Sequence, residues 1–349
     1  MPDADSPDAN DALDRPVVAL VMAGGTGTRL YPASRADRPK QFLSLGVGES
    51  DESLLERTIS RVSFADERYV STSEEYAEQV REAVPEAGLL VEPEPKDTGP
   101  ALVYAAHRIR EQVGDCVLLC VPSDHLVAGE FAASAERAVR TAVETEGLVA
   151  FGVEPTRPAT GYGYIEPGDS AAERAEIEQF REKPDRETAE RFVQEGFYWN
   201  AGLFAWTAES LLGEARNSSL GPLVEALDAG EPERGFAEIE GVSIDYAVME
   251  RTDEAYVVSA DFEWDDVGAW DAIERVVETD DDGNAVVGDG LAIDAAENVL
   301  AADDETHVSV VGVEELVVAA YGDRVLVAPK DEAQRVREVV AELREQGRF

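Results

Sequence analysis

The sequence predicts an α/β fold: a doubly wound, Rossmann-like, mostly parallel sheet followed by a smaller β-rich segment. From residue 16 to about 152, apolar runs alternate with amphipathic helical patterns, which is typical of a parallel sheet with crossover helices. The first run, VVALVMA at 17–23, is apolar throughout, as expected for a strand buried on both faces. After the acidic turn at 278–284, short β-branched runs replace the helices. We therefore expect a disordered acidic tail at 1–15, a main domain at 16–280 and a C-terminal segment at 281–349.

Local signals support the individual elements. Ser53 and Glu56 form a capping box that predicts the start of a helix. Pro100 falls in the first turn of a helix predicted over 98–113, where proline is tolerated. The remaining predictions are strands at 68–72, 88–93, 115–122 and 147–153, helices at 73–84 and about 130–145, mixed short elements over 153–280 and a final helix at 331–346.

The charge balance excludes several kinds of partner. The chain has 30 Lys+Arg against 74 Asp+Glu, a net charge of −44. Such a chain repels phosphate backbones and anionic lipids, so we expect no nucleic-acid and no membrane partner. No apolar run reaches the roughly 18 residues of a membrane span. Because 44% of the residues are apolar, the chain can bury a core and is not a wholly disordered acidic protein.

Only four of the basic residues are lysines: Lys40, Lys96, Lys183 and Lys330. A lysine-poor acidic surface is typical of a salt-adapted protein, because molar salt shortens the screening length to about 3 Å. The alternative is an ordinary acidic protein from a GC-rich genome. We expect salt adaptation. The four remaining lysines are therefore candidates for specific roles.

Two further features indicate the compartment. Residues 1–14 carry acids and no basic region, so we expect a solvated tail rather than a signal peptide. Cys116 and Cys120 lie in an apolar run that predicts a strand, which places them too far apart for a disulfide. We expect both to be core residues, and the protein to be cytoplasmic.

A glycine-rich loop follows the first predicted strand: Gly24-Gly25-Thr26-Gly27-Thr28. Such a loop presents backbone N–H groups to a phosphate. It is not a dinucleotide fingerprint, because Leu30 stands where the last glycine is needed, and no Gly-Lys pair of a P-loop exists in the chain. Alone, the loop is also compatible with a mere tight turn, the less favoured alternative. The nearby cations Arg29, Arg35 and Lys40 favour a phosphate site.

The motifs taken together resemble the sugar-1-phosphate nucleotidyltransferase family. The first motif, GGTGTRLYPASRADRPKQF at 24–42, is more similar to mannose-1-phosphate guanylyltransferases than to the glucose-1-phosphate enzymes. The likeness spans about residues 16–275. It continues through VEPEPKDTGPA (91–101), VPSDH (121–125), TGYGYIE (160–166), FREKP (180–184), WNAGLFAW (199–206), SIDYAVME (243–250) and WDDVGAWDAI (264–273).

The resemblance implies that mannose 1-phosphate attacks the α-phosphorus of GTP, which yields GDP-mannose and releases pyrophosphate. Such a transfer needs positioning and charge neutralisation rather than a covalent nucleophile. One alternative is another pair of hexose 1-phosphate and nucleoside triphosphate. The other is a catalytically silent regulatory paralogue that binds a nucleotide sugar. The complete set of charged motif residues argues against a catalytically silent paralogue. These residues are Arg29, Lys40, Asp124, Lys183 and Asp266.

The resemblance further implies a Mg²⁺ ion held by Asp124 and Asp266. Magnesium is a hard ion that binds few carboxylates and keeps several waters, and here it would stabilise charge on the α-phosphate. The alternative is that Asp124 caps a turn and that Asp266 caps a helix at 268–276. We expect neighbouring Asp265 to be surface acidity. We expect His125 to pack or to hydrogen-bond rather than to bind the metal.

The family pattern also assigns the cations and the sugar contacts. Arg29 would hold the β- and γ-phosphates, and Lys40 would add charge near the reacting phosphates. Lys183 would hold the sugar phosphate, because a rotatable ammonium can follow a moving oxygen. The residues expected to bind the sugar are Glu182, Asn200, Gly161 and Tyr162, although Tyr162 and Tyr164 are also compatible with packing on a strand face.

The nucleotide contacts are expected along the loop from Ala23 to Thr28 and at Thr98. Guanine carries an N1–H and an amino group, so its pocket needs an acceptor. We expect Glu92 to supply it, with Lys96 and Asp97 nearby.

The C-terminal segment matches the family less clearly. In the family this position often holds a short left-handed β-helix that helps dimers form, and the β-branched runs are compatible with it. A homodimer is therefore a further expectation. No cupin-like metal motif follows, and the chain is too short for an appended isomerase domain, so a bifunctional isomerase–guanylyltransferase is disfavoured.

Overall fold

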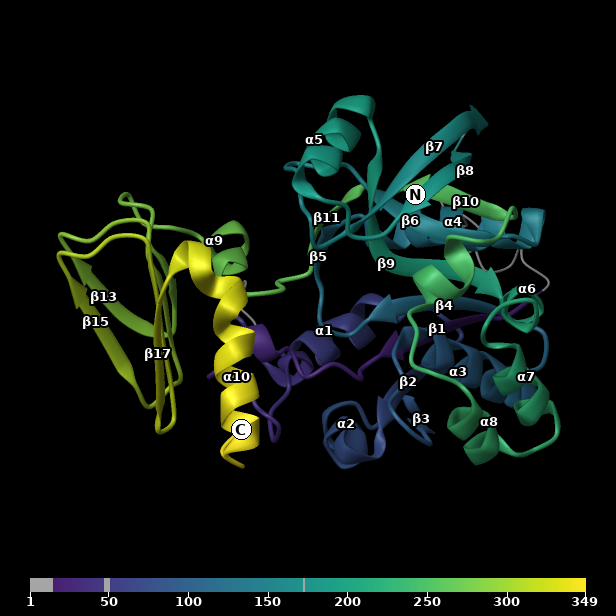
Figure 1. Cartoon of the computed structure of the whole chain (residues 1–349), viewed down its shortest axis with the longest axis horizontal. Coiled ribbons are helices and arrows are strands. Elements are labelled where there is room, and N and C mark those ends of the chain that lie inside the picture. The colour runs from purple at the N-terminus through teal and green to yellow at the C-terminus, as the bar shows by residue number, and fades with distance from the viewer. Residues whose placement is uncertain (1–14, 47–50, 172) are drawn as a thin grey trace, which may run out of the picture. The chain divides into compact units, whose positions relative to one another are not determined.

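The computed structural model describes residues 15–46, 51–171 and 173–349 (Figure 1). Of the acidic tail predicted at 1–15, residues 1–14 lie outside the described residues, and the Arg15 Nε–H donates to Asp115 Oδ2 over 2.6 Å. The chain forms two compact units. The first comprises the residues up to Gly24, Thr58–Pro122 and Ala128–Trp264, and the second comprises Gly25–Arg57, Ser123–Val127 and Asp265–Phe349.

The first unit contains the predicted α/β sheet, which is confirmed and is mixed. Its nine strands follow the order β3-β2-β1-β4-β9-β6-β10-β8-β7, and the section from β3 to β4 is entirely parallel. Strand β9 runs antiparallel to both β4 and β6. The strands are β1 (Val17–Met22), β2 (Glu67–Ser73), β3 (Gly88–Glu92), β4 (Val117–Pro122), β6 (Leu148–Val153), β7 (Gly163–Ala171), β8 (Arg174–Arg181), β9 (Tyr198–Thr207) and β10 (Ala255–Ser259).

Helices connect these strands, and several begin where the sequence predicts. The capping box is confirmed: the Ser53 N–H donates to Glu56 Oε2 over 2.8 Å, and the Glu56 N–H donates to Ser53 Oγ over 3.3 Å. The helices are α1 (Leu54–Arg61), α2 (Ala77–Ala83), α3 (Thr98–Val113), α4 (Phe131–Thr145), α5 (Arg186–Glu195), α6 (Ala208–Arg216), α7 (Gly221–Asp228) and α8 (Pro232–Glu238), with a π-helical turn, η5, at Asp245–Met249.

The strand order reverses at β1, which has β2 on one side and β4 on the other. Ligands of doubly wound folds bind beyond the carboxyl ends of the strands at such a reversal. The last residue of β1, Met22, pairs with Pro122 of β4, so both strands end at the same edge of the sheet. Cys116 and Cys120 are buried free thiols, as predicted.

The second unit contains the C-terminal β-rich segment, which is confirmed. It forms a four-stranded sheet in the order β12-β14-β16-β17 and a two-stranded sheet of β13 and β15. Its elements are the 3₁₀ turns η2 (Thr28–Leu30), η3 (Lys40–Phe42), η6 (Trp270–Ala272) and η7 (Lys330–Arg335), helices α9 (Ile273–Val276) and α10 (Val336–Glu345), and strands β12 (Ala285–Val287), β13 (Asp289–Ile293), β14 (Val299–Ala302), β15 (His307–Val311), β16 (Leu316–Tyr321) and β17 (Arg324–Pro329). Strands β5 (Leu126–Gly129) and β11 (Phe262–Asp265) form a separate pair.

One hydrophobic core joins the beginning and the end of the chain within this second unit. Leu30, directly after the glycine loop, belongs to the same buried cluster as Trp270 and Val336 of α10. The indole N–H of Trp270 donates to the carbonyl of Tyr31 over 2.8 Å. Figure 1 shows α10, in yellow, beside the purple segment that follows β1. The residues next to the glycine loop are therefore packed against the C-terminal segment.

Within the described parts of the chain, no helix is long and apolar enough to cross a membrane.

Candidate functional site

The glycine loop has one glycine that the turn requires and two that leave the backbone open. Gly27 has φ of 64°, and a Cβ at this position would overlap Lys40 Cβ. Glycine is therefore required there for both backbone conformation and space. By contrast, Gly24 and Gly25 are exposed, and nothing lies within 4 Å of a Cβ built on Gly25. The loop thus combines a tight turn with an open stretch of backbone.

Within the second unit, Lys40 contacts the Asp124 carboxylate and the main chain of Asp266, the two residues predicted to bind the metal. Its side chain is only 4% exposed. Its ammonium donates to Asp124 Oδ2 over 2.9 Å and to the main-chain carbonyl of Asp266. The Asp124 side chain remains 31% exposed, and His125 Nε2 lies 3.8 Å from its Oδ1. A buried cation and a carboxylate open to solvent therefore share one small cluster.

This cluster keeps Asp124 ionised. Burial alone would raise the pKa of Asp124, but the charges of Lys40 and His125 and the hydrogen bond from Lys40 outweigh that effect and lower it. An anionic oxygen ligand suits a hard divalent cation. Among the described residues, no group of three or more His, Cys, Asp or Glu side chains could hold a metal. A metal at Asp124 and Asp266 would therefore need phosphate oxygens or waters as further ligands.

The prediction that Asp265 is surface acidity is wrong. Asp265 is 8% exposed, and both its oxygens bind the Arg275 guanidinium, at 2.7 and 3.1 Å. Its Oδ1 also accepts the Val267 N–H over 2.7 Å. The carboxylate therefore shapes the turn in which Asp266 Oδ1 accepts the Gly268 N–H over 3.2 Å. The carboxylate of Asp266 is thus bound to that turn, and α9 begins only at residue 273.

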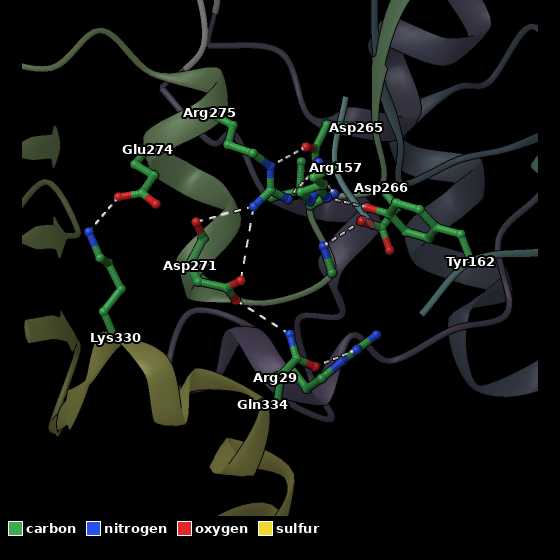
Figure 2. A network of polar contacts seen from close by, with 12 residues as sticks. Arg29, Arg157, Tyr162, Asp265, Asp266, Asp271, Glu274, Arg275, Lys330 and Gln334 are labelled. Carbon is green, nitrogen blue, oxygen red and sulfur yellow. Dashed lines mark hydrogen bonds and ion pairs between the residues drawn. The ribbon is translucent and has the colours of Figure 1, made fainter. Parts of the chain in front are cut away.

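Arg29 lies next to a residue that the sequence did not indicate. Its Nη1 donates to Gln334 Oε1 over 2.8 Å (Figure 2). Gln334 belongs to η7 in the C-terminal segment and lies in none of the motifs. No sequence pattern connects two residues that are 305 positions apart.

In the first unit, Glu182 and Lys183 form an ion pair with unequal exposure. The ammonium lies 2.5 Å from Glu182 Oε1, and the side chains are 58% exposed for Lys183 and 8% for Glu182. Glu182 Oε2 is buried and has no hydrogen-bond partner among the described residues. A Cβ on Gly163 would lie 2.5 Å from this oxygen, whereas a Cβ on Gly161 would have no neighbour within 4 Å. Gly163 is thus the tight position of the predicted turn, whereas Gly161, the expected sugar contact, has open space beside it.

Asn200, also predicted to bind the sugar, is held at both ends of its amide. Its Nδ2 donates to Asp245 Oδ1 over 2.8 Å, and its Oδ1 accepts the Gly202 N–H over 3.1 Å. Burial, reinforced by the charge of Glu182, raises the pKa of Asp245 from 3.8 to about 6, against opposing hydrogen bonds. Asp245 lies in the motif at 243–250, which contributes to the family resemblance, but no role was predicted for this residue. An acid inside the apolar run SIDYAVM was the available signal.

The two tyrosines of the same motif differ. Tyr164 is fully buried and packs against Phe192, with ring centroids 5.5 Å apart, which matches the packing alternative. Tyr162 contacts Trp199 and Trp264 edge-on, and its hydroxyl accepts a hydrogen bond from Arg157 over 3.0 Å. The Tyr162 carbonyl also accepts the Lys183 N–H over 3.2 Å.

Glu92 is buried beside the beginning of the glycine loop. Its oxygen Oε1 would lie 3.9 Å from a Cβ on Gly24. Burial raises the pKa of Glu92 to about 7. The Ala23 N–H donates to the Ser71 carbonyl over 2.8 Å, so this edge of the sheet holds the start of the loop in place.

Two residues near Glu92 have structural contacts. Thr98 Oγ1 accepts the Ile244 N–H over 3.0 Å. The Lys96 ammonium donates to the carbonyls of Phe236 and Ile239 over 2.6 and 2.9 Å, at the end of α8. Lys96 therefore stabilises a helix end, and its retention in a lysine-poor chain has a structural reason.

Comparison with known proteins gives consistent results. The family model described as nucleotidyl transferase matches residues 18–283, and that of a mannose-phosphate isomerase/GMP-like β-helix domain matches residues 283–343. The xanthan biosynthesis protein XanB of Xanthomonas campestris pv. campestris (strain B100) is 38% identical over 95% of this chain and 74% of its own length. A mannose-1-phosphate guanylyltransferase of Sinorhizobium fredii (strain NBRC 101917 / NGR234) is 37% identical over 96% of this chain and 69% of its own.

A solved structure extends the match to the fold. It is described as a mannose-1-phosphate geranyltransferase from Thermus thermophilus and is 37% identical, with a TM-score of 0.85. The match covers 94% of this chain and 99% of the solved one. Since the family model covers most of the chain and these relatives match nearly all of it, the chain belongs to the nucleotidyl transferase family, in the group that includes the mannose-1-phosphate guanylyltransferases.

Proposed function

We propose that the chain transfers GMP from GTP to mannose 1-phosphate, forming GDP-mannose and pyrophosphate. The observation that carries the proposal is the buried Lys40 ammonium, which contacts both the Asp124 carboxylate and the main chain of Asp266. The named relatives support the choice of substrates.

The second unit is proposed to handle the triphosphate. Asp124 and Asp266 would hold a divalent cation, with Mg²⁺ as the expected ion, because their oxygens are hard ligands. When bound, the ion supplies positive charge at the phosphate that is attacked. Lys40 adds a fixed cation in the same cluster, and burial removes competing water from it. The open backbone at Gly24 and Gly25 and the Arg29 guanidinium would bind the remaining phosphate oxygens.

The first unit is proposed to recognise the sugar phosphate. Lys183 has an exposed ammonium that can leave Glu182 and meet a phosphate oxygen. Glu182 Oε2, buried without a partner among the described residues, can accept a hydrogen bond from a sugar hydroxyl. Asn200 is oriented in advance by Asp245 and Gly202, which lowers the entropy cost of binding. Gly161 and Tyr162 complete the proposed sugar contacts.

The base is proposed to bind at Glu92, near Ala23 and Thr98. An ionised carboxylate can accept both the N1–H and the amino group of guanine. Adenine has no N–H at N1, so Glu92 would favour GTP over ATP.

The setting of the enzyme is proposed from the composition. With a net charge of −44 and four lysines, the chain is expected to work in a cytoplasm of high salt. The domain limits at 16–280 and 281–349 and a homodimer are proposed as well. Full activity and refolding in dilute buffer would contradict the salt adaptation.

The test is pyrophosphate release and product identification in concentrated KCl with Mg²⁺, across a matrix of nucleoside triphosphates and hexose 1-phosphates. GTP with mannose 1-phosphate should give the highest kcat/KM, with GDP-mannose as the product. A faster reaction with another pair would replace the substrate assignment. The absence of release with every pair would favour a regulatory paralogue that binds a nucleotide sugar.

A further inference from the structure

The C-terminal segment supplies a direct contact to the arginine that is proposed to bind phosphate. Gln334 Oε1 accepts a hydrogen bond from Arg29 Nη1 over 2.8 Å. Gln334 lies in η7, inside the part of the chain that matches the β-helix domain model. Arg29 lies in the part that matches the nucleotidyl transferase model. Both residues belong to the second compact unit, so the contact is internal to that unit.

The contact continues toward the turn that carries Asp266. Figure 2 shows Gln334 between Arg29 and Asp271, and Gln334 Nε2 donates to Asp271 Oδ1 over 3.4 Å. Arg275 Nη1 donates to the Asp271 carbonyl over 3.4 Å. The same guanidinium binds both oxygens of Asp265, which holds the turn beside Asp266. A continuous polar network therefore runs from Arg29 to this turn.

The backbone on both sides of Gln334 is anchored. Ala333 is 1% exposed, and Val336 is 2% exposed in the core that also contains Leu30. Lys330, at the start of η7, binds Glu274 over 2.6 Å. The Gln334 amide is therefore presented to Arg29 by a fixed segment.

The chemistry of the pair suits a positioning role. A guanidinium has five N–H donors, so one bond to Gln334 leaves the others available to phosphate oxygens. A neutral amide also leaves the charge of Arg29 unpaired, whereas a carboxylate at this position would compete with a phosphate. The chain carries 74 acidic residues and nevertheless has an amide here.

We propose that Gln334 is a positioning residue for Arg29, through which the C-terminal segment sets the direction of the guanidinium toward polyphosphate. The proposal rests on the proposed function for the phosphate-binding role of Arg29. It assigns the C-terminal segment a part in nucleotide binding.

The first experiment measures binding without turnover. Inorganic tripolyphosphate is titrated into the full chain at fixed KCl, for wild type, Gln334→Ala, Arg29→Ala and the double variant. Gln334→Ala should weaken binding about 3- to 10-fold, the range expected for losing one ordinary intramolecular hydrogen bond at an exposed site. In the Arg29→Ala background, the same substitution should have no further effect. Gln346→Ala is the matched control, because Gln346 is an exposed glutamine whose side chain bonds Glu342 and Arg348 and does not contact Arg29.

The second experiment measures KM for each substrate. Gln334→Ala should raise KM for GTP and leave KM for mannose 1-phosphate unchanged, a split that a general structural defect would not produce.

Equal tripolyphosphate binding by Gln334→Ala and wild type, or equal losses in both Arg29 backgrounds, would overturn the proposal. If Gln334→Ala does not fold, Gln334→Glu decides: weaker tripolyphosphate binding supports the proposal and unchanged binding refutes it. A wild-type chain that makes no GDP-mannose but binds tripolyphosphate through Gln334 would refute the proposed function alone.

Discussion

Asp124 in the second unit lies against the Lys40 ammonium, and that contact lowers its pKa although burial opposes the shift. In the first unit, burial raises the pKa of Asp245 to about 6 and that of Glu92 to about 7. At neutral pH the Asp124 carboxyl is thus ionised, the Glu92 carboxyl is close to half-protonated, and the Asp245 carboxyl is mostly ionised but more protonated than a free aspartate. Binding a metal and a triphosphate needs fixed charge, whereas recognising hydroxyls and a base needs hydrogen-bonding groups that discriminate by shape and protonation.

The lysines of the two regions differ in the same way. Lys40 is 4% exposed and already bonded to its partners, so its charge is positioned before substrate arrives. Lys183 is 58% exposed and bonded to Glu182, a contact that a phosphate can replace. For the proposed roles, this difference predicts that Lys40 keeps its contacts when substrate binds, whereas Lys183 leaves Glu182.

The largest effect is expected from Asp124→Asn. The substitution keeps the shape but removes the negative charge, so kcat should fall by at least about 100-fold, as when a preorganised charge is lost. Binding of Mn²⁺, followed by electron paramagnetic resonance as a substitute for Mg²⁺, should weaken in parallel. The control is Asp115→Asn, which removes an exposed partner of Arg15. Activity of Asp124→Asn within fivefold of wild type would contradict the charge assignment.

Lys40→Met tests whether the buried cation is part of the preformed cluster. Removing it leaves the Asp124 carboxylate without its ammonium, so the free energy of unfolding should fall by about 2–4 kcal/mol. The matched control is Arg81→Met, whose exposed pair with Glu78 should contribute less than about 1 kcal/mol. Denaturant unfolding at fixed KCl measures both. Equal losses for the two variants would show that the Lys40 contacts stabilise the protein no more than an exposed ion pair does.

Glu92 should make GTP binding depend on pH. Its pKa of about 7 means that the carboxylate becomes the majority form only above neutrality. KM for GTP should therefore fall several-fold between pH 6 and pH 8, and Glu92→Gln should flatten this profile and reduce the preference for GTP over ATP. Initial-rate kinetics at saturating mannose 1-phosphate would measure both. A flat wild-type profile with unchanged nucleotide preference would remove Glu92 from the base site.

The smallest effect is expected from Asp245→Asn, which should change how the stability of the protein depends on pH. Its pKa is raised from 3.8 to about 6, so its favourable contribution is complete below about 3.8 and is lost as the pH rises through about 6. Because asparagine does not ionise, Asp245→Asn removes this pH-dependent loss of stability. The stability of the variant relative to wild type should therefore increase between pH 4 and pH 7, by on the order of 1 kcal/mol. Melting temperatures across this pH range test the sign, and a relative decrease would contradict it.

The sequence predicts those features that depend on residues close together in the chain or on the positions where parallel strands end. The loop after β1 and Asp124 after β4 follow adjacent parallel strands, and such strands end at one edge of a sheet. Ser53 and Glu56 form a local cap, because the two residues are close in sequence and their contact needs only the first turn of the helix. The motif spacing therefore carried most of the information about these residues.

Other features depend on contacts that no spacing reveals. Asp265 was taken as surface acidity because one buried carboxylate cannot be distinguished among 74 acidic residues without its Arg275 partner. Gln334 meets Arg29 only through the packing of the C-terminal segment. Lys96 is expected near the nucleotide because it lies in the same motif as Glu92, and its ammonium binds main-chain carbonyls at the end of α8. Each of these three depends on tertiary packing.

The most direct test of the account is the rate of GDP-mannose formation by wild type and Lys183→Ala, with each substrate varied in turn in concentrated KCl. The account predicts GDP-mannose as the wild-type product. For Lys183→Ala it predicts a KM for mannose 1-phosphate that is at least about 10-fold higher, because a charged contact to the sugar phosphate is lost, with KM for GTP within about twofold of wild type. No GDP-mannose from wild type, or equal changes in both KM values, would contradict the assignment of Lys183 to the sugar phosphate.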